Sequence, residues 1–105
     1  MTFRIRLTRD AEADLDRLFD VLVERELARD SGNLDLPDQA IAALRAGIAT
    51  LRSSPFTCRK AGNSPFLREL VIAFELSGYV ALFEIEDEST VAVVAVRQQR
   101  EDDYH

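Results

Sequence analysis

The sequence predicts an α+β domain with the element order β-α-α-β-β-β, in which a helical hairpin packs on a small, mainly antiparallel sheet. Two stretches with apolar residues at spacings of three and four occupy the first half of the chain, and three β-rich runs occupy the second half. The chain has 105 residues, of which 47% are hydrophobic. This suffices for one core and is too little for two, so we expect residues 1–105 to form a single domain.

The first half of the chain predicts a strand followed by two helices. Residues 3–7 alternate apolar and charged side chains, which indicates a strand with one apolar face. Thr8 is a suitable N-cap for an amphipathic helix that runs to about Arg29, where a polar, glycine-containing turn ends it. Pro37 suits the first turn of a second helix. Gly47 lies inside that helix, and a close crossing of the two helices would explain its presence.

The second half predicts three strands after a polar loop over residues 57–64. The β-rich runs cover residues 66–75, 79–86 and 90–97, and only short turns separate them. Because a parallel crossover needs a dozen or more residues, we expect these strands to be antiparallel neighbours. With the first strand, they make a sheet of four strands.

The two faces of this sheet are expected to carry different side chains. In the middle run, one face receives Tyr79, Ala81, Phe83 and Ile85, and the other receives Val80, Leu82, Glu84 and Glu86. Residues 91–96 are apolar on both faces. Since two helices can cover only one face, the second face is either closed by the chain's own loops or forms a groove for another chain.

The charge distribution argues against a nucleic-acid-binding surface. The net charge is 13 − 19 = −6, and half of the excess comes from Glu101, Asp102 and Asp103. No broad basic stripe is present, so we expect no direct binding to duplex DNA by this chain alone. The acidic segment either solvates the surface, contacts a basic partner or shields neighbouring arginines.

Several classes of chemistry are excluded by residue counts. Cys58 is the only cysteine and His105 the only histidine, which excludes an internal disulfide and a Cys/His zinc site. The glycines have no phosphate-loop spacing. We therefore expect no metal and no cofactor, and interpret Cys58 as a loop thiol. No apolar run approaches the length of a membrane span, and the first residues lack the apolar centre of a signal peptide, so we expect no membrane partner and a cytoplasmic location.

Four segments of the chain match a known pattern. They are Arg6 to Leu15, Leu67-Arg68-Glu69-Leu70, Ser77-Gly78-Tyr79-Val80, and Val96-Arg97-Gln98-Gln99-Arg100 with the residues up to Tyr104. In this order the chain resembles the ParE/RelE superfamily of type II toxin–antitoxin toxins, also labelled plasmid-stabilisation proteins, and is closer to ParE. The resemblance implies a growth-inhibiting toxin that a cognate antitoxin neutralises by packing into apolar grooves, in a hetero-oligomeric complex.

The resemblance implies one of two activities. RelE-like toxins are similar to ribosome-dependent mRNA interferases, and an enzyme of that type would use Arg68, Arg97, Tyr104 and His105 here. However, Lys60 is the only lysine, and Gln98 stands where relatives carry a histidine. ParE-like toxins are similar to non-enzymatic poisons that bind DNA gyrase, and a poison needs no proton-transfer set.

We therefore predict a toxin that binds and inhibits DNA gyrase and is not an enzyme. The alternatives are an endoribonuclease of the RelE type and a non-toxic antitoxin-binding module. Candidate residues for contact with the target or the antitoxin are Arg59, Lys60, Arg68, Arg97, Arg100 and Tyr104. Arg68 could instead make a cross-strand ion pair, and Tyr104 could dock on its own domain. We interpret Tyr79 as an aromatic packing residue.

Overall fold

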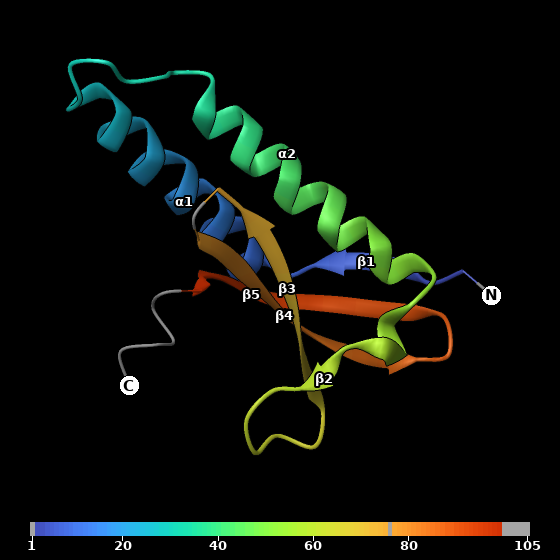
Figure 1. The fold of residues 1–105 in the computed structure, drawn as a ribbon. Coiled ribbons are helices and arrows are strands. Elements are labelled where there is room, and N and C mark those ends of the chain that lie inside the picture. The colour runs from blue at the N-terminus through green and yellow to red at the C-terminus, as the bar shows by residue number, and fades with distance from the viewer. Residues whose placement is uncertain (1, 76, 100–105) are drawn as a thin grey trace.

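The computed structural model describes residues 2–75 and 77–99, and the elements in these ranges follow the predicted order (Figure 1). They are β1 (Arg4–Leu7), α1 (Arg9–Leu27), α2 (Leu36–Ala49), the 3-10 turns η1 (Thr50–Arg52) and η2 (Pro55–Thr57), β2 (Arg59–Lys60), β3 (Leu67–Phe74), β4 (Ser77–Asp87) and β5 (Thr90–Gln98). Within the described residues one 5-stranded sheet has the order β1-β5-β4-β3-β2. β1 lies parallel to β5 and the other pairs are antiparallel, which confirms the predicted fold class.

The sheet has one strand more than the sequence predicts. The loop expected over residues 57–64 contains the short edge strand β2, in which Arg59 pairs with Glu69 and Lys60 pairs with Arg68. The prediction of four strands is therefore wrong. A strand of two residues is too short to produce an alternating pattern, so no periodicity predicts it.

Helix α1 begins where capping chemistry places it. The backbone N–H of Ala11 donates to the Thr8 hydroxyl at 3.1 Å, which confirms Thr8 as the N-cap. Asp10 and Glu12 lie in the first turn, where the helix dipole favours negative charge. The helix ends at Leu27, two residues before the predicted end.

The turn between the helices is held by a buried carboxylate that the sequence analysis did not single out. Glu26 is only 3% exposed, and it accepts from the backbone N–H of Asn33 at 2.9 Å and from Arg29 at 3.2 Å. Gly32 lies so close that a Cβ there would be 1.9 Å from the carbonyl oxygen of Glu26. The turn therefore requires glycine at this position.

The second helix approaches the sheet closely at Gly47. A Cβ at this residue would lie 2.7 Å from Cγ1 and 2.8 Å from Cδ1 of Ile72 in β3. The expected close crossing of the two helices at Gly47 is therefore wrong, because the nearest neighbour is a strand. The absence of a side chain allows α2 to settle onto the sheet.

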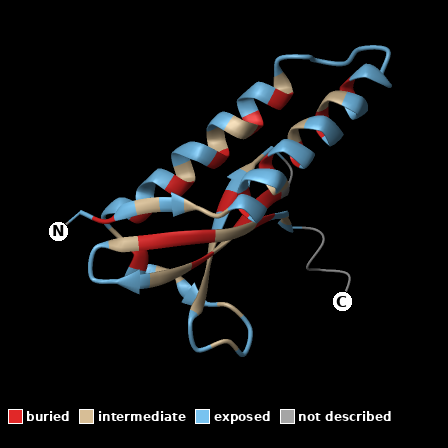
Figure 2. Ribbon diagram, turned by 180° about the vertical axis from the view of Figure 1, so that it is seen from behind, coloured by how far each residue is buried: buried red, intermediate tan, exposed pale blue. Residues whose placement is uncertain are grey.

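The core lies between the helices and one face of the sheet, which we call the covered face. Both helices alternate buried and exposed segments, as Figure 2 shows. On the sheet side, the alternation predicted for β4 is confirmed: Tyr79, Ala81 and Phe83 are buried in the core, and Ile85 packs against it. The helices contribute Leu15, Leu18, Leu22, Ala40, Leu44 and Ile48 to the same cluster.

Candidate functional site

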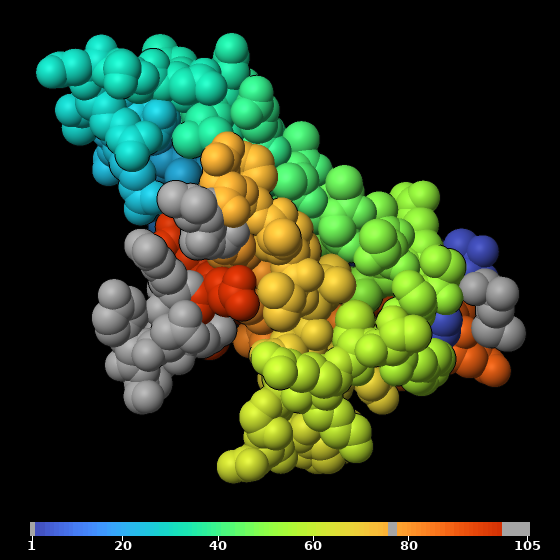
Figure 3. Space-filling model, in the orientation of Figure 1, coloured from blue at the N-terminus to red at the C-terminus, as the bar shows by residue number. Residues whose placement is uncertain are grey.

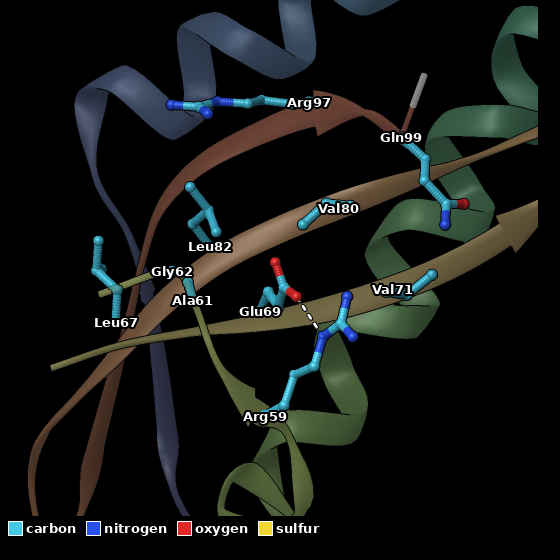
Figure 4. A pocket seen from close by; sticks show the side chains of 10 residues that line it. All are labelled: Arg59, Ala61, Gly62, Leu67, Glu69, Val71, Val80, Leu82, Arg97 and Gln99. Atoms are coloured by element: carbon cyan, nitrogen blue, oxygen red, sulfur yellow. Dashed lines mark hydrogen bonds and ion pairs between the residues drawn. The ribbon is translucent and has the colours of Figure 1, made fainter. Parts of the chain in front are cut away.

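The opposite face of the sheet, which we call the open face, carries a groove of about 390 Å³. Its lining comes from β3, β4, β5 and the segment around β2 (Figure 4). The lining residues are Arg59, Ala61, Gly62, Leu67, Glu69, Val71, Val80, Leu82, Arg97 and Gln99. The loop between β2 and β3 projects from the body beside this region (Figure 3). The helical hairpin thus covers one face of the sheet and leaves a groove on the other.

The floor of the groove is apolar. Val80 is 3% exposed although it lies outside the helix-covered core, and Leu82 is half-buried beside it on β4. Val71 on the adjacent strand β3 is 45% exposed. An apolar side chain from another segment could bury this surface, at roughly 25 cal/mol for each Å² removed from water.

Two arginines from different strands give the groove positive charge. Arg59 of β2 forms an ion pair through Nε with Glu69 of β3, and its side chain remains 77% exposed. Arg97 of β5 is also exposed, and its backbone lies opposite Val80 in the β4–β5 ladder. A guanidinium is a fork of N–H donors suited to carboxylates, so these two side chains of the groove have the chemistry to bind acidic or carbonyl groups.

A β-bulge places Arg97 on the open face. Phe83 pairs with Val93 and Leu82 pairs with Ala95, so Val94 is an extra residue in β5. Before the bulge, the side chains at odd positions enter the core, as Val93 does. After it the alternation is reversed, so Arg97 lies on the same side of the sheet as Val80, and it also lines a second hollow with Asp10 and Asp14 of α1.

Beyond Val93, strand β5 is no longer paired with β1, and residues of α1 and its N-cap contact this edge instead. Asp14 accepts from the backbone N–H of Val96 at 2.9 Å, and the Thr8 hydroxyl donates to the carbonyl of Val94 at 3.4 Å. These contacts occupy backbone groups that could otherwise pair with another strand. The strand that carries Arg97 is thereby fixed against the first helix.

Arg68 lies on the covered face, apart from Arg59 and Arg97. Its guanidinium donates to the carbonyl of Cys58 at 2.7 Å and to that of Phe56 at 3.5 Å, and lies 5.8 Å from the centre of the Phe56 ring. These contacts attach the segment after α2 to β3. The structure therefore separates Arg68 from the arginines of the groove, and in place of the cross-strand ion pair that was one alternative for it, Arg68 donates to backbone carbonyls.

The other predicted site residues fall elsewhere. Lys60 is exposed and directly opposite Arg68, so it shares the covered side of the sheet and does not line the groove. Gln98 lies opposite Tyr79, on the covered side as well. Arg100, Tyr104 and His105 lie outside the described residues.

Tyr79 and Cys58 both behave as packing residues. Tyr79 is 5% exposed, and its ring centre lies 6.3 Å from that of Phe74. Burial raises the pKa of the Tyr79 hydroxyl, and the charge of Arg25 opposes this shift. Burial also raises the pKa of the Cys58 thiol, partly opposed by Arg68. A thiol with a raised pKa has little thiolate, which agrees with the interpretation of Cys58 as a loop thiol.

Glu69 and Gln99 are groove residues that the sequence analysis missed as candidates. The signal for Glu69 was available, because strict alternation along β3 puts Leu67, Glu69 and Val71 on one face and Arg68 on the other. Gln99 follows the bulge, so no pattern marked it. Among the described residues no cluster of His, Cys, Asp or Glu could hold a metal ion. No helix in the described ranges is long and apolar enough to cross a membrane.

Comparisons with known proteins agree with this architecture. A family model described as "ParE toxin of type II toxin-antitoxin system, parDE" matches residues 5–103. A solved chain from a chromosomal ParDE TA system of P. aeruginosa superimposes with a TM-score of 0.73. The match covers 92% of this chain and 96% of that one, at 17% sequence identity, and at this identity it shows the fold. No curated protein matches the sequence.

Proposed function

The chain belongs to the ParE toxin family of type II toxin–antitoxin systems, and from this premise we propose how it is neutralised and what it inhibits. A cognate antitoxin fills the groove on the open face, in a hetero-oligomeric complex, and the free toxin binds and inhibits DNA gyrase in the cytoplasm. The observation that carries the proposal is the open face itself, with an apolar floor beside two arginines.

The groove suits a segment of polypeptide. Val71 and the half-buried Leu82, on either side of the buried Val80, offer apolar surface to side chains spaced along an extended or helical segment. Arg59 and Arg97 can bind carboxylates or backbone carbonyls at the sides of the same groove. Large apolar patches with polar rims are typical of interaction sites, and the covered face shows that this sheet has only one side filled by the helices.

Binding accounts for the groove better than acid–base catalysis does. Its ionisable side chains are Arg59, Glu69 and Arg97, and Glu69 is engaged by Arg59. Neither Lys60 nor Gln98 lines the groove. A gyrase poison requires a docking surface only, which this arrangement provides.

One observation favours ribonuclease activity as the second candidate. Glu69 is a carboxylate in the same groove as two guanidinium groups, and cleavage of RNA needs a base for the 2′-hydroxyl and cations for the phosphate. In that case Glu69 would be the base, and Arg59 and Arg97 would hold the phosphate.

The test compares the two activities directly. The purified chain is added to a gyrase supercoiling assay with and without the antitoxin encoded beside it, and mRNA 5′ ends are mapped after induced expression. We expect loss of supercoiling, recovery with antitoxin, and unchanged mRNA ends. Codon-registered cuts that disappear in Glu69→Gln would establish the ribonuclease instead. Growth and supercoiling that stay unaffected would indicate a non-toxic binding module.

A matched pair of variants locates the antitoxin site. Arg97→Gln removes a charge from the groove, and Arg45→Gln removes the same charge from an exposed position on α2. We expect antitoxin to lose affinity for the first variant only. Equal losses would show that the groove is not the antitoxin site.

A further inference from the structure

A second pocket lies on the covered side of the sheet, at the end of the helical hairpin, and shares no lining residue with the groove. We call it the hairpin pocket. Its volume is about 430 Å³, and its lining includes Leu22, Arg25, Leu36, Phe74, Glu75 and Tyr79. We propose that it binds a free amino acid with a large apolar side chain, held by its carboxylate at Arg25 and Tyr79 and by its ammonium group at Glu75. This site does not depend on the proposed function.

The hydroxyl of Tyr79 is the first observation that points to a ligand. Tyr79 is 5% exposed, and its hydroxyl takes part in no hydrogen bond with the residues that the structure describes. In the same residues every side-chain nitrogen or oxygen sealed from solvent has a partner, so this hydroxyl must reach open space. Tyr79 lines the hairpin pocket, and a buried tyrosine generally binds through its hydroxyl. An acceptor atom of a ligand in the pocket can therefore bind it.

The charged side chains of the pocket are the second observation. Glu26 and Arg29 neutralise each other in an ion pair of 3.2 Å. Arg25 on α1 and Glu75 after β3 are both exposed, and neither belongs to an ion pair of the described residues. A cation and an anion thus line one pocket without contacting each other. A ligand that carries both charges can satisfy both side chains.

Arg25 and Tyr79 together form a site for a carboxylate. Burial raises the pKa of the Tyr79 hydroxyl, which therefore stays protonated and donates, and the charge of Arg25 acts on the same hydroxyl from nearby. Both groups are donors, and the planar fork of a guanidinium matches the two oxygens of a carboxylate. The donors consequently favour a ligand whose acceptor is negatively charged.

Glu75 occupies a position at which the turn does not require glutamate. Phe74 pairs with Ser77, so two residues connect β3 to β4. Glu75 is the first of them, and it is the one residue other than glycine with a positive φ, 55°, in the described ranges. Glycine, asparagine and aspartate are favoured at such positions. The carboxylate of Glu75 therefore has its use in the pocket, where it can bind an ammonium group.

The walls of the pocket provide room for an apolar group. Phe74 and Leu36 are half-buried, and Leu22 lies behind them with 4% exposure. The ring centres of Phe74 and Tyr79 are 6.3 Å apart, so two aromatic side chains form one side of the pocket. Pockets for small molecules typically combine such walls with a few polar groups that orient the ligand.

These features together specify the class of ligand. A carboxylate, an ammonium group and an apolar side chain on one small molecule describe an α-amino acid such as phenylalanine or leucine. The carboxyl terminus of a peptide lacks the ammonium group beside its carboxylate, and so does a fatty acid. Either of them would leave Glu75 without a partner.

The first test is an NMR titration of the isolated, full-length chain with L-phenylalanine and, separately, with L-leucine. We expect saturable shifts at the methyl groups of Leu22 and Leu36 and none at Val71 and Leu82 in the groove, with a dissociation constant of about 1 mM. The absence of saturable shifts with both amino acids would overturn the site. Saturable shifts confined to the groove would overturn it as well.

Analogues of phenylalanine test each part of the recognition. Phenylalaninamide lacks the carboxylate, N-acetylphenylalanine lacks the ammonium group, and L-alanine lacks the large side chain. Each should bind at least about ten-fold more weakly than L-phenylalanine, as expected for loss of a charged hydrogen bond or of the apolar contact. Equal binding by any of the three would overturn recognition of the amino acid as a whole.

Matched variants test the three side chains. Arg25→Gln and Glu75→Gln should each weaken L-phenylalanine binding about ten-fold, whereas Arg45→Gln, which removes a charge from an exposed position on α2, should bind normally. Tyr79→Phe should weaken binding about three- to ten-fold and leave the midpoint of thermal unfolding unchanged, because the described residues give its hydroxyl no partner. Equal losses in Arg25→Gln and Arg45→Gln, or full affinity in Tyr79→Phe, would overturn the assignment.

Discussion

The two faces of the sheet are made by alternate residues of the same strands, yet one is buried in the core and the other is open to solvent at a groove. In β4, Ala81 and Phe83 are fully buried beneath the helices, while the neighbours Val80 and Leu82 form the floor of the groove. The comparison teaches that alternate residues of one strand supply the core on one face and, under the proposed function, the partner-binding surface on the other. Substitutions at adjacent positions should therefore separate the two.

The largest contrast is expected between Phe83 and Leu82. Phe83→Ala leaves a cavity in the core and should lower the free energy of unfolding by about 3–5 kcal/mol. Leu82→Ala should lower it by less than about 1.5 kcal/mol, because this side chain is only half-buried, but should weaken antitoxin binding. Urea denaturation measures the first effect and calorimetric titration the second. Similar losses of stability would mean that both faces contribute equally to the core.

The close packing of the covered face can be tested at Gly47. Gly47→Ala gains about 1 kcal/mol of helix propensity, but the new Cβ collides with Ile72, and overpacking costs about 1–3 kcal/mol. We expect a net loss of stability in thermal or urea denaturation. In an Ile72→Val background, which removes Cδ1, the loss should shrink. An increase in stability on Gly47→Ala alone would show that α2 does not approach the sheet this closely.

Two arginine variants that each remove one positive charge, from opposite faces of the sheet, should have different effects. Arg97→Gln should weaken antitoxin binding about 10-fold, as expected for loss of a charged contact, and should leave stability nearly unchanged. Arg68→Gln should leave the affinity unchanged but lower stability by about 1 kcal/mol, because the bond to the Cys58 carbonyl is lost. A loss of affinity on Arg68→Gln together with a loss of stability on Arg97→Gln would contradict the placement of the two side chains.

The smallest effect is expected at a turn that belongs to neither face. The backbone N–H and the hydroxyl of Ser89 hold the pKa of Asp87 below its ordinary value. The ionised form therefore favours the folded state above the ordinary carboxyl pKa, and this contribution is lost as the pH falls through the depressed pKa. Ser89→Ala removes the hydroxyl and should raise the pKa of Asp87 part of the way back. An NMR titration that finds no rise would contradict this.

Most of the fold could be predicted from the sequence because both helices and the four longer strands have strong local signals. The helical stripes, the Thr8 cap and the alternation of Tyr79, Ala81 and Phe83 all survive in the structure. The features that were not predicted depend on contacts between segments far apart in the sequence. Strand β2 exists only through its pairing with β3, and Gly47 is explained by Ile72.

The site was harder to predict, for a physical reason. Arg97 reaches the open face only because Val94 is an extra residue in β5. Since residues 91–96 are apolar throughout, there was no alternation for the bulge to interrupt, and the sequence could not reveal it. The position of Arg68, unlike that of Arg97, could be predicted, because alternation along β3 puts its side chain on the face opposite to Leu67, Glu69 and Val71. A stricter use of that pattern would have separated it from Arg97.

The central claim is that a partner segment occupies the open face. The most direct measurement is methyl NMR of the chain as the antitoxin encoded beside it is added. We predict large shift changes at the methyl groups of Val71, Val80 and Leu82, and little change at Leu44 and Ile48 in the core between the helices and the sheet. Saturated binding that leaves Val80 and Leu82 unperturbed would contradict the claim.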